Sequence, residues 1–375
     1  MSNVKIETLT PVHIGSGTLL YENVDFVHVN IKKVPHIVII SEEKVWKLLG
    51  EQHLDNWLEA ISKRENLSLF LEKYAPYAKS SDYAKRRIPL SCQPSNYPDT
   101  LKECIHNGMG LPYIPGSSIK GAIRTAILAS FASTISDKEN KIYARDKRGN
   151  LLKDRRGNQI FEAAKIEQDF FGKDPNTDVL RFLQVGDAYF EKGTEIATRL
   201  VNLNIRQSDD LIDKSKSQVV EAIGVQFESE LNLKISTTHY NFAKENNRQI
   251  GDLPILTIGD LFRLINEHAK ILVEDEIRNW SEIDKTGGDD YVEEMKKILQ
   301  KINSCEAGKS CILRIGHASG WRFITGAWTE GLANFEDVVV PASRPNNRNY
   351  EDYEFPKTRR LDEDSDILGF VKLTV

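Results

Sequence analysis

Apolar and polar residues alternate along several stretches of the chain, as they do in strands with one buried face. This pattern runs from one end of the sequence to the other, and two of the stretches are spaced as a hairpin would be. The pattern predicts strands at residues 4–9, 24–30, 34–40, 180–190, 224–235 and 367–375.

Between these strands, apolar residues recur at three- and four-residue steps, which indicates helices buried along one side. Strands separated by helices, with antiparallel character, predict an α+β fold of the ferredoxin-like or RNA-recognition type with long helical and loop insertions. The helices are expected within residues 42–77 and at 119–131, 256–273 and 293–302.

Two stretches show neither the alternation of a strand nor the three- and four-residue steps of a helix. Residues 80–110 contain several prolines and are predicted to form an irregular connector. Residues 137–160 are basic, repeat the pattern DKRGN as DRRGN, and are expected to form a projecting hairpin or a mobile loop.

These patterns suggest two parts. We expect an N-terminal ferredoxin-like domain at residues 1–235, with insertions at about 41–110 and 137–160. Residues 236–375 would form a helical part and a second, similar unit. This boundary is soft, because strands from the two ends of the chain can share a sheet.

Composition narrows the possible functions. The 375 residues carry a net charge of −5, so any binding of nucleic acid must come from local basic patches. The four cysteines form no CxxC pair and are expected to be reduced thiols. No signal region and no run of about 18 apolar residues occurs, so we expect a cytoplasmic protein without a membrane partner.

One helix begins at an unusual place. The stretch YIPGSSIKGAIRTAIL starts with a Pro-Gly turn and two serines, either of which could cap the helix that follows. Its two cations oppose the helix dipole by about 0.3–1 kcal/mol, unless an anion binds at the N-terminus. A phosphate site and an ordinary amphipathic helix with a solvated basic face are equally consistent with this segment. The residues of the possible site are Gly116, Ser117, Ser118, Lys120 and Arg124.

Three further segments combine glycines with basic residues. They are TPVHIGSG after the first strand, RIGHASGWRFITG late in the chain, and PKTRRL near its end. Glycines let a backbone approach a phosphate closely, and cations can contact a single-stranded backbone. The candidate RNA-binding residues are His13, Gly15, Ser16, Gly17, Arg314, Gly316, His317, Ser319, Gly320, Arg322, Arg359 and Arg360.

In this order and spacing, the four segments resemble the repeat-associated mysterious proteins, or RAMPs, of type III-A CRISPR systems. They are most similar to the fifth subunits of Csm effector complexes. The resemblance implies a fold of RNA-recognition-like units and a non-catalytic subunit that binds the 3′ part of the guide RNA. It also implies contacts with the backbone RAMP subunit and the small helical subunit, a role in antiviral defence, and guide 3′-end maturation by separate host nucleases.

Two alternatives remain. His13 and His317 both lie beside glycine turns and could cut repeat RNA by general acid–base catalysis without metal. The chain could instead be a structural cap that contacts protein partners and little RNA.

Trp321 and Phe323 could stack on a base, although their spacing favours a place in the core. No metal site and no cofactor is predicted, because P-loop, HExxH and GxSxG motifs do not occur.

Overall fold

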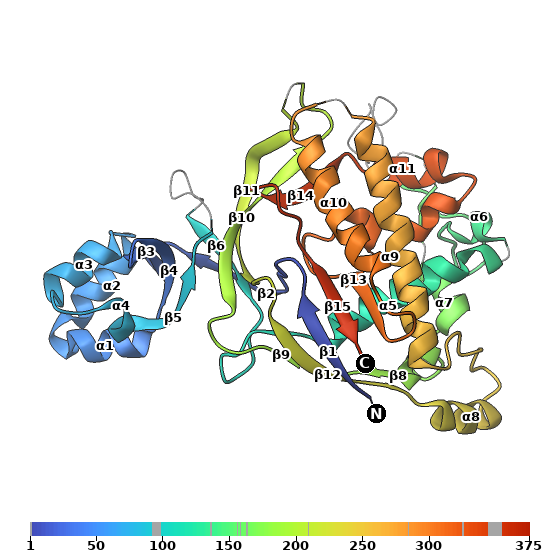
Figure 1. The fold of residues 1–375 in the computed structure, drawn as a ribbon, viewed down its shortest axis with the longest axis horizontal. Coiled ribbons are helices and arrows are strands. Elements are labelled where there is room, and N and C mark those ends of the chain that lie inside the picture. The colour runs from blue at the N-terminus through green and yellow to red at the C-terminus, as the bar shows by residue number, and fades with distance from the viewer. Residues whose placement is uncertain are drawn as a thin grey trace.

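The fold is α+β, with a large body and a smaller lobe that projects from it (Figure 1). None of the helices in the described part of the chain is long and apolar enough to cross a membrane. The computed structural model describes residues 2–91, 99–135, 137–155, 157, 159–162, 164–208, 210–283, 285–324, 326–343 and 355–375.

The first sheet of the body has the strand order β13-β15-β1-β12-β8. Its central strand pairs antiparallel with one strand from the middle of the chain and one from its end. Strands from both sides of residue 235 therefore share this sheet. Its members are β1 (Ser2–Thr8), β8 (Leu183–Val185), β12 (Glu228–Ile235), β13 (Ser310–Arg314) and β15 (Phe370–Thr374).

The second sheet has the order β14-β10-β11-β6-β2 and contains the two longest strands. It too draws its last strand from the end of the chain, because β14 pairs with β10. Its members are β2 (Gly15–Tyr21), β6 (Thr100–Cys104), β10 (Glu195–Asn204), β11 (Ile212–Ile223) and β14 (Thr358–Asp362). A separate two-stranded ribbon pairs β7 (Tyr113–Ile114) with β9 (Ala188–Tyr189).

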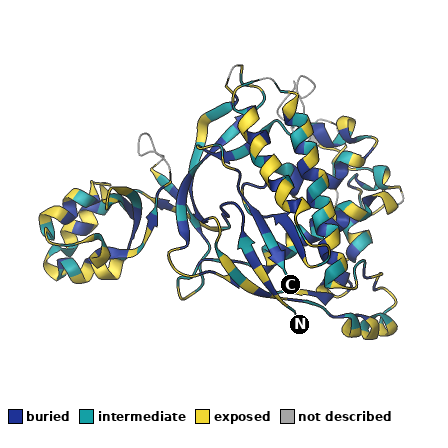
Figure 2. Ribbon diagram, viewed as in Figure 1, coloured by how far each residue is buried: buried dark blue, intermediate teal, exposed yellow. Residues whose placement is uncertain are grey.

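Helices cover the side of the body away from the lobe (Figure 1). α5 and α9 share one hydrophobic core with the first sheet, and α9 and α10 share a second core with β10 and β14. Burial of the inner side of each helix, against exposure of its outer side, is visible in Figure 2. The helices are α5 (Gly116–Phe131), α6 (Lys138–Lys141), α7 (Ala164–Phe171), α8 (Thr237–Asn246), α9 (Ile258–Ser281), α10 (Gly288–Asn303) and α11 (Val340–Ser343).

The lobe is a three-stranded sheet with its own helices. One face of the sheet packs against these helices, and the other face packs against Leu101, Ala197 and Val219 of the second sheet. The lobe therefore has its own core and is also joined to the body. Its elements are β3 (Phe26–Ile31), β4 (Val34–Ile40), α1 (Glu42–Leu49), α2 (Leu54–Ser62), α3 (Leu67–Tyr74), α4 (Ser80–Tyr83) and β5 (Ala84–Pro89).

Most of the strands and helices predicted from periodicity are present, but three predictions need correction. Residues 80–110 are not an irregular connector, because they supply β5 and β6. Residues 180–190 hold a 3-10 turn and two short strands rather than one strand. The long strands β10 and β11 were missed, because many charged and polar residues interrupt their apolar positions.

The basic segment 137–160 contains α6 and bridges such as Arg145–Leu151 and Lys153–Gln159, so hairpin pairing is present in it. Residues 156 and 158 lie outside the described part of the chain. Cys104, Cys305 and Cys311 are free thiols, and Cys92 lies outside the described residues.

Candidate nucleic-acid interface

Two of the predicted glycine segments meet in space. The amide of His317 donates a hydrogen bond to the carbonyl oxygen of His13 at 3.0 Å, and the two imidazole rings lie edge to face with centroids 5.8 Å apart. Gly316 has φ of 88°, and a Cβ there would lie 2.6 Å from the oxygen of His13. The glycine is therefore required for the contact between the two loops.

A third predicted segment joins them. Arg360 of β14 donates a hydrogen bond from its guanidinium to Nε2 of His317, so this histidine is neutral with its proton on Nδ1. Partial desolvation of its ring, together with the positive charges of Arg360 and Lys102, lowers the pKa of His317 to about 4. His317 is exposed, whereas Arg360 and Lys102 are half-buried. We call Lys102, His317 and Arg360 the cation cluster.

Lys102 was missed in the sequence, because it lies in the stretch read as a connector. In the structure it is on β6, and Arg360 contributes to lowering its pKa, after burial. Lys102 and Arg360 both act on His317, and Arg360 disfavours the charge of Lys102, so an anion would stabilise this site. No feature of the local sequence pointed to Lys102, since β6 joins the second sheet through a non-local pairing with β11.

The first glycine loop is held firmly beside this cluster. His13 is only 3% exposed, its Nδ1 donates to the carbonyl oxygen of Glu221 at 2.6 Å, and burial lowers its pKa. Ser16 donates to Glu103 at 3.1 Å. Gly15, Ser16 and Gly17 are exposed, and nothing lies within 4 Å of a Cβ built on Gly17. These residues are the irregular start of β2, where the pairing with β6 shifts between Gly15 and Leu19, and they present exposed backbone, while His13 anchors the preceding segment to Glu221.

Three predicted arginines are not on the surface. Arg314, Arg322 and Arg359 are 5–6% exposed and surround Glu276 of α9. Arg359 donates to Glu276 at 2.7 Å and Arg322 donates to it at 2.9 Å. Burial would raise the pKa of Glu276, but the two guanidiniums lower it to about 2. These arginines therefore do not present their charge at the surface, because Arg322 and Arg359 donate to a buried carboxylate and Arg314 donates to the carbonyl oxygen of Leu368 at 2.9 Å.

Other residues of the segment RIGHASGWRFITG also have structural roles rather than a free surface. Trp321 and Phe323 lie in a 3-10 turn rather than a strand, and their rings pack against Phe335 and Phe370 at centroid distances of 5.9 and 5.7 Å. Ser319 is 3% exposed and bonds within its own turn to Gly316. Gly320 has φ of 78° and open space around it. The structure thus supports the interpretation that Trp321 and Phe323 belong to the core, rather than the one in which they stack on a base.

The N-terminus of α5 differs from the phosphate site that the sequence allowed. Pro115, not a serine, is the N-cap. The amide of Gly116 donates to Oδ1 of Asp187 at 2.7 Å, and a Cβ on Gly116 would lie 2.2 Å from the oxygen of Val185. The protein's own carboxylate therefore supplies the negative charge at this terminus, and the glycine allows the helix to pack on β8.

The two cations of α5 have different surroundings. Arg124 donates to Asp178 at 2.9 Å, and its guanidinium lies 3.9 Å from the ring centre of Phe171. Lys120 is half-buried, and burial lowers its pKa. Ser117 is exposed and Ser118 is half-buried, and their role in RNA binding stays a prediction. Ser117 and Lys120, with Arg181, line a surface groove of about 560 Å³.

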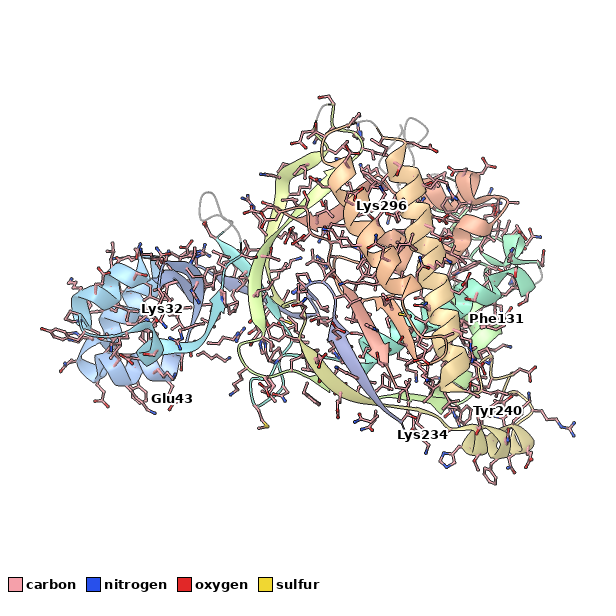
Figure 3. All side chains as sticks on the ribbon, in the orientation of Figure 1. Lys32, Glu43, Phe131, Lys234, Tyr240 and Lys296 are labelled. Atoms are coloured by element: carbon pink, nitrogen blue, oxygen red, sulfur yellow. The ribbon has the colours of Figure 1, made fainter. Side chains whose placement is uncertain are left out.

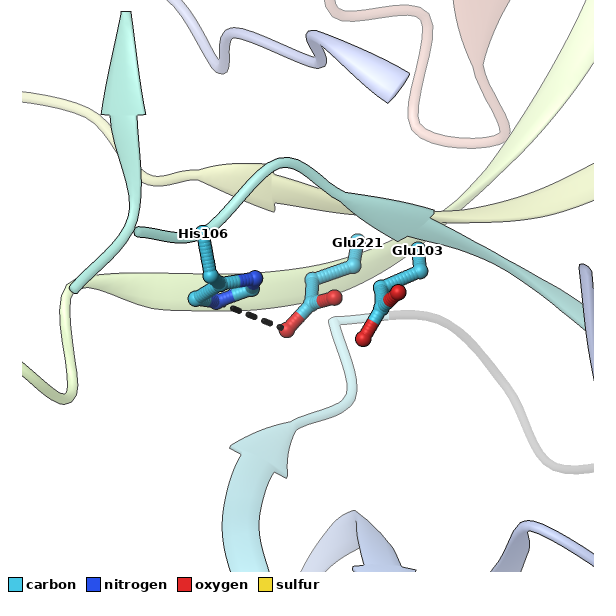
Figure 4. A group of neighbouring side chains, drawn as sticks. All are labelled: Glu103, His106 and Glu221. Atoms are coloured by element: carbon cyan, nitrogen blue, oxygen red, sulfur yellow. Dashed lines mark ion pairs between the residues drawn. The ribbon is translucent and has the colours of Figure 1, made fainter. Parts of the chain in front are cut away.

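A second group of ionisable side chains lies under the glycine loop. The ligand atoms of Glu103, His106 and Glu221 lie within 4.8 Å of one another (Figure 4). Arg86 of the lobe donates to both oxygens of Glu221, at 2.7 and 2.8 Å, and to Glu103 at 2.9 Å. An arginine thus already pairs with both carboxylates and joins the lobe to the body. The sequence had not indicated this group, since its members come from three strands and a loop.

Comparison with known proteins agrees with the fold and the motifs. The RAMP superfamily profile matches residues 5–323, and the chain therefore belongs to this superfamily. The CRISPR system Cms protein Csm5 of Methanocaldococcus jannaschii is 26% identical over 336 residues, which are 85% of this chain and 71% of that protein.

Two solved structures have the same fold. One is a chain in the cryo-EM structure of a Csm–crRNA–target RNA ternary complex of a type III-A CRISPR–Cas system, with a TM-score of 0.67, 18% identity and full coverage of both chains. The other is the crystal structure of T. onnurineus Csm5, with a TM-score of 0.63, 18% identity, and coverage of 98% of this chain and 99% of that one. The similarity to fifth-subunit RAMPs expected from the motifs is confirmed.

Proposed function

We propose that this chain is a non-catalytic subunit of a type III-A CRISPR effector complex, where it binds the 3′ part of the guide RNA. In this role it caps the backbone of RAMP subunits, contacts the small helical subunit, and supports trimming of the guide 3′ end by host nucleases. Membership of the RAMP superfamily and the likeness to Csm5 proteins support this assignment. We expect the complex to act in the cytoplasm in antiviral defence.

The observation that carries the proposal is the convergence of three distant segments on one surface. The exposed backbone of Gly15–Gly17, the His317 loop and Arg360 meet beside Lys102. Open glycine backbone next to cations suits contact with phosphates, whose recognition does not depend on base sequence. A guide complex needs such contacts, because base pairing supplies its sequence specificity.

The test replaces the cation cluster in the assembled complex. We expect Lys102→Ala/His317→Ala/Arg360→Ala to lower the amount of guide RNA that copurifies and to change the distribution of guide 3′ ends. The matched control is Lys296→Ala/Lys301→Ala, which removes the same formal charge from the exposed side of α10. Equal guide retention and equal 3′ ends in the two variants would contradict the proposal.

A second candidate, a metal-independent endoribonuclease, is favoured by the 5.8 Å separation of the rings of His13 and His317. General acid–base catalysis at neutral pH needs one protonated and one neutral group. The pKa of each histidine is lowered, and Nδ1 of His13 is taken by a carbonyl oxygen, so these two histidines supply a base but not an acid. Cleavage of repeat RNA in EDTA by the wild type, lost in His13→Ala, would favour this candidate over the first.

A further inference from the structure

A groove of about 450 Å³ lies at the N-terminus of α8, a ten-residue helix at the lower right of the body in Figure 1. The helix follows β12 directly and lies beside β8, and Figure 3 labels Tyr240 on it. None of the described residues that line the groove is acidic. They are Arg181, Phe182, Gln184, Ser236, His239 and Phe242.

Ser236 is the N-cap residue of α8, yet its hydroxyl does not cap the helix. The side chain is 5% exposed, and no hydrogen-bond partner for its Oγ is found among the described residues. A buried polar atom without a partner costs free energy that a ligand atom can recover. The first amides of a helix also lack partners within the helix and favour an anion. Two separate features at this point therefore indicate an anionic ligand.

The other side chains of the groove suit a nucleotide. Phe242 is 69% exposed, which is unusual for a large apolar ring and offers a flat face for stacking. Arg181 is exposed and lies against the ring of Phe182, 4.9 Å from its centre, which is in turn held by Tyr240 at 5.5 Å. The guanidinium is thus oriented by packing and by the hydrogen bond that it donates to the carbonyl oxygen of Asn176, and its other N–H groups can reach a phosphate.

The groove continues toward α5. Arg181 also lines the neighbouring groove that contains Ser117 and Lys120. Lys173, another residue of that groove, adds a further exposed cation. Asp174 and Asp178 also line that groove, and Arg124 is paired with Asp178. Lys120, Lys173 and Arg181 are therefore the cations that the two grooves offer to the phosphates of a single strand.

We propose that the N-terminus of α8 is a nucleotide subsite for single-stranded RNA. The phosphate binds at Ser236, the first-turn amides and Arg181, and the base stacks on Phe242. The strand continues along the groove at Lys120. This inference rests on the proposed RNA-binding function but concerns a surface separate from the cation cluster, so the two can be tested independently.

The experiment measures binding of the full chain to a 5′-fluorescein-labelled 12-nucleotide oligouridylate by fluorescence anisotropy. Phe242→Ala is expected to weaken binding roughly 5- to 100-fold, as loss of one base–aromatic stack does, while Phe242→Trp retains affinity. Arg181→Gln should reduce the slope of log affinity against log salt by about 0.7, and Phe242→Ala should leave this slope unchanged. Ser236→Ala should weaken binding without lowering the unfolding midpoint.

The matched control is Tyr77→Ala, which removes another exposed aromatic ring, 95% exposed and on the lobe. Affinities of Phe242→Ala and Tyr77→Ala that both equal the wild type would overturn the subsite. If the Lys102, His317 and Arg360 variant then still weakened binding, the proposed function would stand without it. A wild-type chain that does not bind the oligouridylate would overturn the subsite, whereas the proposed function would still be decided by guide retention in the assembled complex.

Discussion

Arg359 and Arg360 are neighbours on β14, and they have opposite roles. Arg359 is 6% exposed and donates to Glu276 inside the protein. Arg360 is half-buried and donates to His317 in the cation cluster. Successive side chains on a strand point to opposite faces of the sheet, so a single step along the chain separates a structural arginine from a candidate ligand-binding one.

The other basic residues near these two arginines divide in the same way. Arg314 and Arg322 lie with Arg359 around one buried carboxylate, whereas Lys102 and His317 lie with Arg360. A buried guanidinium must be paired and fully hydrogen-bonded, while a cation near the surface is already solvated. Substitutions in the first group should therefore affect stability, and those in the second should affect binding.

The largest effect should come from Arg359→Ala. This change leaves Glu276 buried without its main partner, and we expect the free energy of unfolding to fall by about 3–5 kcal/mol. Arg360→Ala should cost less than about 1 kcal/mol, because its site is partly solvated. Urea denaturation of both variants measures the difference, and equal losses in the free energy of unfolding would show that the two arginines do not differ in role.

The next largest effect should come from acid, which is expected to lower the free energy of unfolding through the buried group around Glu276 rather than through the cation cluster. The pKa of Glu276 in the folded protein is about 2, below its ordinary value, so its contribution to stability is complete above pH 4.5 and is lost as the pH falls toward 2. About 2 kcal/mol of this contribution should be lost by pH 3. Denaturation between pH 6 and 3 measures it, with Glu276→Gln as the control expected to show a weaker dependence. An identical pH profile in this control would show that other carboxylates are responsible.

A smaller effect is expected at α5. Asp187→Ala removes the acceptor of the Gly116 amide, and we expect a loss of about 0.5–2 kcal/mol in the free energy of unfolding, as for removal of a capping residue. RNA affinity should change less than about twofold, since this carboxylate already serves as the helix's anion. A large gain in affinity would show instead that Asp187 blocks a phosphate site.

The smallest effect concerns the cation cluster. A bound phosphate should raise the pKa of His317, which in the free protein is lowered to about 4 by burial, Arg360, Lys102 and His13. Binding then takes up a proton, so affinity should rise a fewfold, roughly two- to fivefold, as the pH falls from 7.5 to 5.5. Fluorescence anisotropy measures this dependence, and His317→Asn should remove it. The same dependence in that variant would exclude His317 as its source.

Much of the fold could be predicted from local pattern. The strands at the two ends, the hairpin of the lobe and the helices α5, α9 and α10 all have strong periodicity, because each buries one face. β6, β10 and β11 were not predicted, because their burial comes from neighbouring strands and from the lobe sheet packed on them. Such burial is set by contacts distant in sequence, which local alternation does not report.

Residue type and order were enough to identify the superfamily and the set of glycine and basic residues that resemble an RNA-binding protein. Which of those residues are available to a ligand depends on the packing of segments that are distant in the chain. In the folded chain, Arg314, Arg322 and Arg359 lie around Glu276. Asp187 accepts a hydrogen bond at the N-terminus of α5, and Lys102 lies beside His317 and Arg360. The physical reason is that the charge of a side chain belongs to its chemistry, whereas its exposure and its partners are set by how distant segments pack.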